Sequence, residues 1–184
     1  FAKAYLNTIL LYMHLEEMKY DLVIVGAGPA GLSTAIKLKQ LDKKNNTNHS
    51  VCIIEKGSEV GAHILSGAIL DPVALNELIP DWINLDTPVS TEVKSEKFSF
   101  FTSKNYFNIP KVLLPSDTNN KGNFIISLGN LCKWLANYAE NLGVDIFPGF
   151  TAKEILYDNC GKEKGVITGE KGIDKDGNKI DLYE

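Results

Sequence analysis

The most constraining feature of this sequence is an apolar run that leads directly into a glycine-rich turn. Leu22 to Val25 precede the segment Gly26-Ala27-Gly28-Pro29-Ala30-Gly31, and a stretch of helical character follows from Leu32 to about Gln40. A second apolar run, Val51 to Ile54, ends on the acid Glu55. Strand, glycine turn, helix, strand and acid, in this order, form the context in which a GxGxxG pattern indicates a dinucleotide-binding unit.

Each glycine of the turn has its own physical task. Gly26 permits a tight turn after the strand, Gly28 lets the backbone approach a pyrophosphate, and Gly31 lets the helix pack closely on the strand. The unpaired N–H groups at the start of the helix, together with the positive end of its dipole, suit phosphate groups. A plain surface turn is the alternative, and the flanking strands and acid make it the weaker one.

The acid and the loop after it indicate which dinucleotide fits. Glu55 is expected at the end of the second strand, where a carboxylate can accept hydrogen bonds from both ribose hydroxyls. An acid there argues against a 2′-phosphate, so FAD or NAD fits better than NADP. The loop that follows is rich in small residues, with glycines at 57, 61 and 67. Such a loop suits a flavin, whose ribityl chain and ring need backbone contacts.

Composition excludes some classes of function. The chain has 184 residues and a formal net charge of −4, and no basic patch is interleaved with aromatic residues, so nucleic-acid binding is not expected. Cys52, Cys132 and Cys160 match no metal or iron–sulfur spacing, and we expect free thiols. No apolar run reaches the roughly 20 residues of a membrane-spanning helix. Residues 1–18 are expected to be an extraneous or disordered leader, with a truncated targeting segment as the alternative.

Two segments in the middle of the chain each allow two interpretations. Asp71 and Pro72 are expected to begin a compact helix with Leu75, Leu78, Ile79 and Trp82 at helical spacing. Pro80 is expected to end this helix or to kink its last turn. The apolar face either packs on the core or lies in a membrane interface. Residues 98–115 are aromatic and extended, and a hairpin that turns at residues 103–105 is expected. This segment is either the core of a second lobe or an exposed surface for a partner, a membrane or a ligand.

The second half of the chain reads as further strands around one strong helix. Phe124 to Ser127 is expected to be a strand, and an amphipathic helix closed by Gly143 follows it. Val144 to Phe147 is expected to be another strand, and residues 152–168 a hairpin around Gly161. The polar stretch from Asp42 to Ser50 is expected to be a solvated surface loop. The fold class is therefore α/β, a Rossmann-like FAD/NAD(P)-binding domain with a parallel sheet and an inserted β-rich, aromatic segment.

Three longer stretches resemble the N-terminal part of electron transfer flavoprotein–ubiquinone oxidoreductase. They are YDLVIVGAGPAGLSTAIKLKQL, VCIIEKGSEVGAHILSGAILDPVALNELIPDW and GNFIISLGNLCKWLANYAENLGVDIFPGF. The glycine turn is shared by many flavoproteins. The segments EKGSEVGAHILSGAILDP and NIPKVLLPSDTNNKGNFIISLGNLCKWL are more specific to this family. The resemblance runs from about Tyr20 to the C-terminus.

The resemblance implies a set of cofactor-binding residues for FAD. It assigns the pyrophosphate to the glycine turn, the ribose to Glu55, and a place near the flavin to the backbone of Ser66-Gly67-Ala68. No catalytic residue or metal ligand is assigned to this chain. The candidate cofactor-binding residues are Gly26, Ala27, Gly28, Pro29, Ala30, Gly31, Glu55, Lys56, Ser66, Gly67 and Ala68.

The resemblance also implies an activity and partners. Enzymes of this family work at the membrane surface and pass electrons from reduced electron transfer flavoprotein to ubiquinone. The stretch from Val60 to Asp81 corresponds to their membrane-embedded part, which favours the interfacial interpretation of the helix. The implied location is the matrix face of the mitochondrial inner membrane in a eukaryote, or the cytoplasmic membrane in a bacterium.

Parts of the family pattern are missing from this chain. The family has a cysteine-ligated 4Fe-4S cluster near the C-terminus of a much longer chain, and neither those cysteines nor the second FAD-contacting motif is found here. We therefore expect residues 19–184 to be an incomplete FAD-binding domain, with residues 84–122 as a β-rich insertion. In isolation this part is expected to bind FAD poorly and to be inactive. A cluster-free flavoprotein of the geranylgeranyl-reductase type and an inactive nucleotide-binding fragment are the alternatives.

Overall fold

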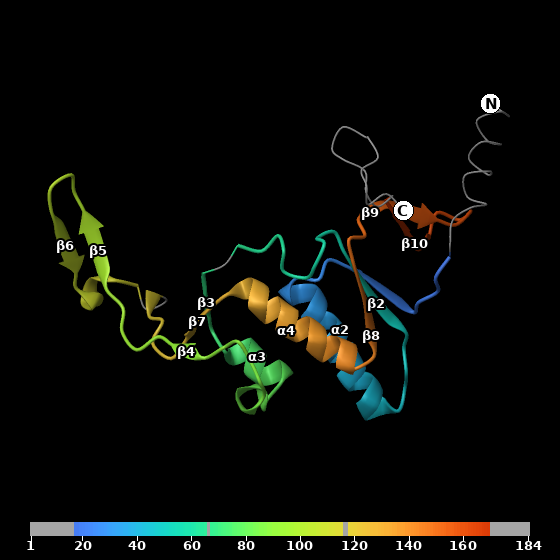
Figure 1. The fold of residues 1–184 in the computed structure, drawn as a ribbon, viewed down its shortest axis with the longest axis horizontal. Helices are drawn as coiled ribbons and strands as arrows, with labels where there is room; N and C mark the ends of the chain where they lie inside the picture. The colour runs from blue at the N-terminus through green and yellow to red at the C-terminus, as the bar shows by residue number, and fades with distance from the viewer. Residues whose placement is uncertain (1–16, 66, 116–117, 170–184) are drawn as a thin grey trace.

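The centre of the fold is a three-stranded parallel sheet. The structure is a computed structural model that describes residues 17–65, 67–115 and 118–169 (Figure 1). The sheet contains β1 (Leu22–Val25), β2 (Val51–Glu55) and β8 (Val144–Pro148), in the order β1-β2-β8. The middle strand, β2, is buried at its first four residues, as expected for a parallel strand with neighbours on both sides. This topology confirms the predicted α/β fold class.

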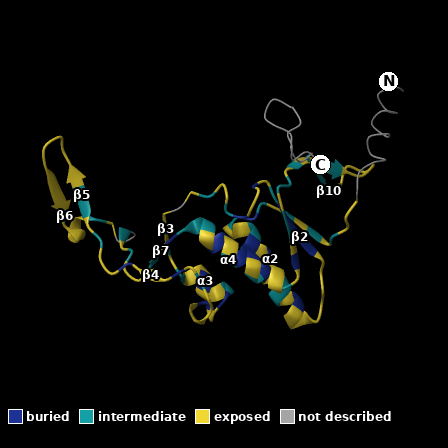
Figure 2. Cartoon of the chain, in the orientation of Figure 1, coloured by how far each residue is buried: buried dark blue, intermediate teal, exposed yellow. Residues whose placement is uncertain are grey.

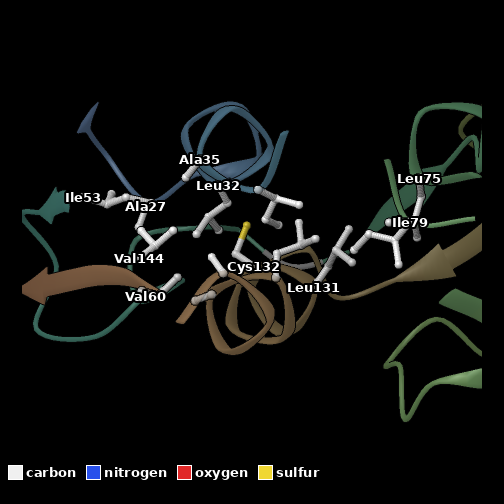
Figure 3. Packing of buried hydrophobic residues seen from close by; sticks show 14 of the residues in the cluster. Ala27, Leu32, Ala35, Ile53, Val60, Leu75, Ile79, Leu131, Cys132 and Val144 are labelled. Carbon is white, nitrogen blue, oxygen red and sulfur yellow. The ribbon is translucent and has the colours of Figure 1, made fainter. Parts of the chain in front are cut away.

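Two long helices lie side by side and form the main core with this sheet (Figure 1). They are α2 (Pro29–Asn45) and α4 (Leu128–Asn141). Side chains from both helices meet in one cluster, where Leu32 of α2 and Cys132 of α4 are fully buried (Figure 3). Ile53 of β2 and Val144 of β8 complete the cluster on the sheet side. Helix α4 begins at its cap Ser127, whose hydroxyl accepts a hydrogen bond from the N–H of Asn130.

Helix α2 is longer than the sequence predicted, and the expected surface loop is correspondingly shorter. The helix continues to Asn45 and ends in a left-handed Asn46. Asp42, expected in a solvated loop, is instead buried inside the last turn. Its carboxylate accepts hydrogen bonds from the hydroxyl of Thr47 at 2.7 Å and from the backbone N–H of His49 at 3.0 Å. The polar loop is therefore folded around one buried carboxylate.

The Asp42 carboxylate should make the stability of this loop depend on pH. Hydrogen bonds from Thr47 and His49 hold its pKa below the usual range. Because the folded pKa is lower than the unfolded one, this stabilisation is complete above the unfolded pKa of about 4 and is lost as the pH falls through the folded pKa. We expect Asp42→Asn to lower the urea midpoint at pH 7, and the difference from the wild type to shrink between pH 5 and pH 3. An equal difference at every pH would contradict this assignment.

A second, smaller sheet lies beyond the N-terminal end of α4 (Figure 1). It is antiparallel, in the order β3-β7-β4, and consists of β3 (Ala68–Leu70), β4 (Thr91–Glu92) and β7 (Phe124–Ile126). The strand at 124–126 confirms the prediction. The other two strands were not predicted, because each is too short to show alternation in the sequence.

The segment between β3 and β4 contains the predicted compact helix, which ends before Pro80 as one of the two expected outcomes, and Trp82 lies outside it. It forms α3 (Val73–Leu78) and a separate 3₁₀ turn, η1 (Trp82–Asn84), because Pro80 interrupts the backbone between them. Trp82 is only 3% exposed, its indole N–H donates to the Asn76 side chain, and its ring packs edge-on against Phe124. Leu75 and Ile79 are buried in the same core. The core interpretation of this face is confirmed, and the interfacial one is wrong for these side chains.

The aromatic segment forms the predicted hairpin, and it projects away from the rest of the chain (Figure 1). Its strands are β5 (Phe98–Phe101) and β6 (Tyr106–Ile109), followed by the 3₁₀ turn η2 (Lys111–Leu113). Most of its residues are exposed, in contrast to α2 and α4 (Figure 2). The alternative of a buried second lobe is therefore wrong within the described part of the chain.

The described chain ends in an antiparallel pair of strands. These are β9 (Ala152–Tyr157) and β10 (Glu163–Thr168), which turn around Gly161 as predicted. Cys52, Cys132 and Cys160 are free thiols, also as predicted. All but the last two residues of the expected leader lie outside the described residues.

Candidate functional site

The glycine turn joins β1 to α2 in the conformation that the sequence predicted. Gly26 has a φ of +99°, which favours glycine, and its N–H donates to the carbonyl of Ile54 at 2.8 Å. Gly31 lies directly against this turn. A Cβ built on Gly31 would come within 2.1 Å of the carbonyl oxygen of Gly26 and 3.1 Å of the Ile24 side chain. Glycine at position 31 is therefore required for the close approach of helix and strand.

The first turn of α2 offers free hydrogen-bond donors. Gly28 is the N-cap residue and Pro29 follows it at the start of the helix, so no side chain caps the helix. No acidic residue lies in the first turn. A Cβ built on Gly28 would meet nothing within 4 Å, so the space beside this backbone is open. An uncapped helix start with open space beside it is a suitable place for a phosphate.

Glu55 lies at the mouth of this turn. Its Oε2 accepts a hydrogen bond from the backbone N–H of Ala27 at 2.8 Å, and its Oε1 accepts one from the N–H of Gly57 at 2.7 Å. Each carboxylate oxygen has two acceptor positions, so one on each oxygen remains for another donor. The structure thus brings together the two parts of the site that the sequence predicted separately.

The carboxylate of Glu55 also influences the buried cysteine behind it. Burial, and then the negative charge of Glu55, raise the pKa of Cys132 to about 11. The thiol is fully buried in α4. It therefore stays protonated at neutral pH and acts as a small apolar core residue rather than as a nucleophile.

The loop after β2 packs on the first turn of α4. Gly61 has a φ of +87°, and a Cβ on it would lie 2.8 Å from the carbonyl oxygen of Gly129. Glu59 pairs with Lys133 of α4 at 2.9 Å. Sequence reasoning found the glycines of this loop but missed Gly129 as the partner of Gly61. A glycine in the first turn of a strong helix was the available signal.

The remaining candidate residues are less closely connected to the turn. Pro29 and Ala30 occupy the first positions of α2, and Lys56 is exposed after β2. Gly67, with a φ of +90°, leads into Ala68, which pairs with Ile126 in the smaller sheet. Ser66 lies outside the described residues. The structure therefore joins Gly26 to Gly31 with Glu55, and it shows no bond from Gly67 or Ala68 to them.

Residues 17–65, 67–115 and 118–169 contain neither a candidate metal site nor a candidate membrane span. No cluster of three His, Cys, Asp or Glu side chains in this part of the chain could hold a metal ion. No helix in the same part is both long and apolar enough to cross a membrane.

The fold is of the Rossmann type, with the glycine turn and Glu55 side by side at one end of its parallel sheet. A family model described as an NAD(P)-binding Rossmann-like domain matches residues 24–97, which include the glycine turn and Glu55. The chain is also similar in sequence to the electron transfer flavoprotein–ubiquinone oxidoreductases, as its motifs predicted. It is 51% identical over 172 residues to the protein of that name from Pseudomonas aeruginosa and 54% identical over 159 residues to the mitochondrial one from Dictyostelium discoideum.

These matches cover most of this chain and a small part of the relatives. They include 93% and 86% of this chain, but only 31% and 26% of the two relatives. The mitochondrial relative from Rattus norvegicus is 49% identical, with 89% of this chain and 26% of the relative covered. The chain thus spans less than a third of the length of these curated relatives.

Solved structures show the same fold. A geranylgeranyl bacteriochlorophyll reductase-like protein from Thermoplasma acidophilum is 25% identical, with a TM-score of 0.58, and the match covers 81% of this chain and 34% of that one. The myxobacterial halogenase CndH, described as a variant of FAD-dependent halogenases, is 16% identical with a TM-score of 0.53. That match covers 88% of this chain and 34% of the halogenase and supports the fold alone.

Proposed function

We propose that this chain binds the ADP part of FAD at the glycine turn. The observation that carries the proposal is the hydrogen bond from Ala27 to Glu55, which holds a carboxylate with free acceptor positions beside the open, uncapped start of α2. The N–H groups there would bind the diphosphate, and Glu55 the ribose hydroxyls. The same carboxylate would repel a 2′-phosphate, which favours FAD over NADP.

We further propose that the whole protein passes electrons from electron transfer flavoprotein to ubiquinone. This proposal rests on the similarity to electron transfer flavoprotein–ubiquinone oxidoreductases, which are about 50% identical to this chain over roughly nine-tenths of its length. FAD would carry the electrons, and a 4Fe-4S cluster would be bound by residues beyond this chain. The 25% identity to a geranylgeranyl reductase-like protein gives less support to the cluster-free alternative. A visible spectrum of the whole protein, with absorption beyond the flavin bands, tests for the cluster.

A direct test of the site is ligand binding by matched glycine variants. Gly28→Glu places a negative charge in the open space beside the start of α2, so it should weaken FAD and ADP binding by at least about tenfold through repulsion of the phosphates. Gly165→Glu is the matched control, because a Cβ on Gly165 also meets nothing within 4 Å and β10 contributes nothing to the proposed site. Calorimetric titration with FAD, ADP and NADP⁺ measures the three affinities.

Three results would count against the proposed binding. Failure of the wild-type chain to saturate with ADP or FAD would support the alternative of a fragment without nucleotide binding. Equal losses in Gly28→Glu and Gly165→Glu would show that the charge acts outside the glycine turn. Tighter binding of NADP⁺ than of FAD would show that Glu55 does not select against a 2′-phosphate.

We also propose that the protein contacts a membrane surface, through its exposed aromatic hairpin rather than through the helix that contains Leu75. The side chains of Leu75, Ile79 and Trp82 are buried in the core. Four aromatic residues of β5 and β6 are exposed, and the hairpin lies away from that core (Figure 2). They are Phe100, Phe101, Tyr106 and Phe107. A contiguous exposed apolar surface of this kind is typical of a membrane or partner contact. The implied location is the inner mitochondrial or bacterial cytoplasmic membrane.

A further inference from the structure

The carboxylate of Glu55 is held at two points that belong to different segments. Ala27 N–H, from the glycine turn, binds one oxygen, and Gly57 N–H, from the loop after β2, binds the other. A carboxylate held at one oxygen can still rotate, whereas two anchors fix its plane. The acceptor positions left over on the two oxygens therefore point in fixed directions.

The second anchor is itself firmly placed. The carbonyl of Gly57 accepts a hydrogen bond from the N–H of Gly149 at 2.8 Å, and the carbonyl of Glu55 accepts one from Phe150 at 2.9 Å. These bonds continue the pairing of β2 with β8 beyond the last paired residues. Gly57 is buried, so its N–H has no water to replace the carboxylate.

Position 57 also has no room for a side chain without disturbing Glu55. A Cβ built on Gly57 would lie 3.1 Å from Oε1 of Glu55 and 3.0 Å from the carbonyl oxygen of Glu59. Both distances are shorter than ordinary van der Waals contacts. A methyl group there would press on the same oxygen that the N–H of Gly57 holds.

We propose that Gly57 is a positioning residue that sets the selectivity of the site for an intact ribose diol. Its N–H and its lack of a Cβ fix the Glu55 carboxylate so that both remaining acceptor positions face the two vicinal hydroxyls of one ribose. This inference rests on the proposed function of the glycine turn. It adds that recognition of the sugar depends on a residue that need not touch the ligand.

The test compares ADP with 2′-deoxy-ADP, which share the diphosphate and differ by one hydroxyl. We expect the wild-type chain to bind ADP about tenfold more tightly, the effect of one hydrogen bond to a charged acceptor. Gly57→Ala should reduce this ratio to about twofold while affinity for 2′-deoxy-ADP changes little. Gly165→Ala is the control, and it should keep the wild-type ratio.

A second variant removes the anchor without adding any atom. Replacing Gly57 by glycolic acid turns the amide into an ester, in which an oxygen takes the place of the N–H that binds Glu55 and no side chain is introduced. The preference for ADP over 2′-deoxy-ADP should again fall to about twofold. This outcome separates the loss of the hydrogen bond from the crowding caused by a methyl group, and it remains informative if Gly57→Ala fails to fold.

The outcomes distinguish this inference from the proposed function. If the wild type prefers ADP, Glu55→Gln abolishes the preference and the glycolate variant keeps it, then Glu55 binds the ribose without help from Gly57 and the inference is wrong. If the wild type binds neither nucleotide, the proposed function itself fails. A parallel loss of the preference in Glu55→Gln and in the glycolate variant supports both.

Discussion

Replacing Gly31 by alanine is expected to lower the free energy of unfolding by about 3 kcal/mol and to abolish nucleotide binding. The added Cβ would lie 2.1 Å from the carbonyl oxygen of Gly26. Neither atom belongs to a flexible side chain, so the start of α2 must move away from β1. Overpacking of this kind costs roughly 1–3 kcal/mol, and the contact here is severe.

The sign of this effect is informative, because helix propensity predicts the opposite. Alanine within a helix is about 1 kcal/mol more favourable than glycine. The steric term must therefore exceed the propensity term for the variant to be destabilised. Urea unfolding followed by circular dichroism measures the net effect, and Gly165→Ala, which has open space and an ordinary φ, should stay within about 0.5 kcal/mol of the wild type. A Gly31→Ala chain as stable as the wild type would show that β1 and α2 are not in close contact.

The glycine turn and Glu55 could be predicted from the sequence because each depends on local rules. The φ of Gly26 follows from a tight turn, the packing of Gly31 from a helix that must return over its strand, and the place of Glu55 from the end of a strand. The parallel order of the strands follows because the connection between them contains a helix. None of these inferences needed knowledge of distant contacts.

Other features depended on contacts that a linear pattern does not show. The helical spacing of Leu75, Ile79 and Trp82 is the same whether their side chains pack on protein or on lipid. The contacts of Trp82 with Phe124 and with the Asn76 amide show that these side chains pack on protein. Asp42 begins a run of polar residues that extends to Ser50, and such a run predicts a solvated loop. The burial of Asp42 is possible because Thr47 and His49, which follow the end of α2, donate hydrogen bonds to its carboxylate.

The anchoring role of Gly57 was hidden for a related reason. The sequence shows a glycine two residues after an acid, which is equally consistent with any bend. The structure shows that the N–H of Gly57 binds the Glu55 carboxylate. It also shows that a Cβ built on Gly57 would lie only 3.1 Å from Oε1 of Glu55. Local sequence thus predicted what the backbone does, and it failed where one side chain acts on another segment.

The hairpin has an apolar surface on both sides of its two strands. Phe100 packs against Phe107, and Phe101 stacks on Tyr106, with ring centroids 5.3 Å and 5.6 Å apart. These pairs stabilise the hairpin by roughly 0.2–1 kcal/mol each. All four rings are nevertheless more than half exposed, and Phe101 is 73% exposed. Within the described residues, the rings therefore pack on one another and leave most of their apolar area uncovered.

Replacing Phe100 and Phe101 by serine is expected to reduce binding to phosphatidylcholine vesicles by roughly 100-fold. Burial of a phenylalanine ring in an apolar medium is worth about 1.5 kcal/mol or more, and each such loss lowers the affinity by about tenfold. Neutral lipid excludes a contribution from charge, and vesicle flotation measures the partitioning. Because neither ring belongs to the core around Leu32, the urea midpoint of this core should stay unchanged.

The matched control removes two exposed apolar side chains from another part of the surface. Ile155→Ser with Tyr157→Ser changes β9, where both residues are about half exposed. If the hairpin is the membrane contact, this control binds vesicles as the wild type does. Equal losses in both double variants would indicate nonspecific adhesion of apolar surface. A wild-type chain that binds no vesicles would make a protein partner the better explanation for the exposed rings, since an apolar surface of this kind is costly to leave in water.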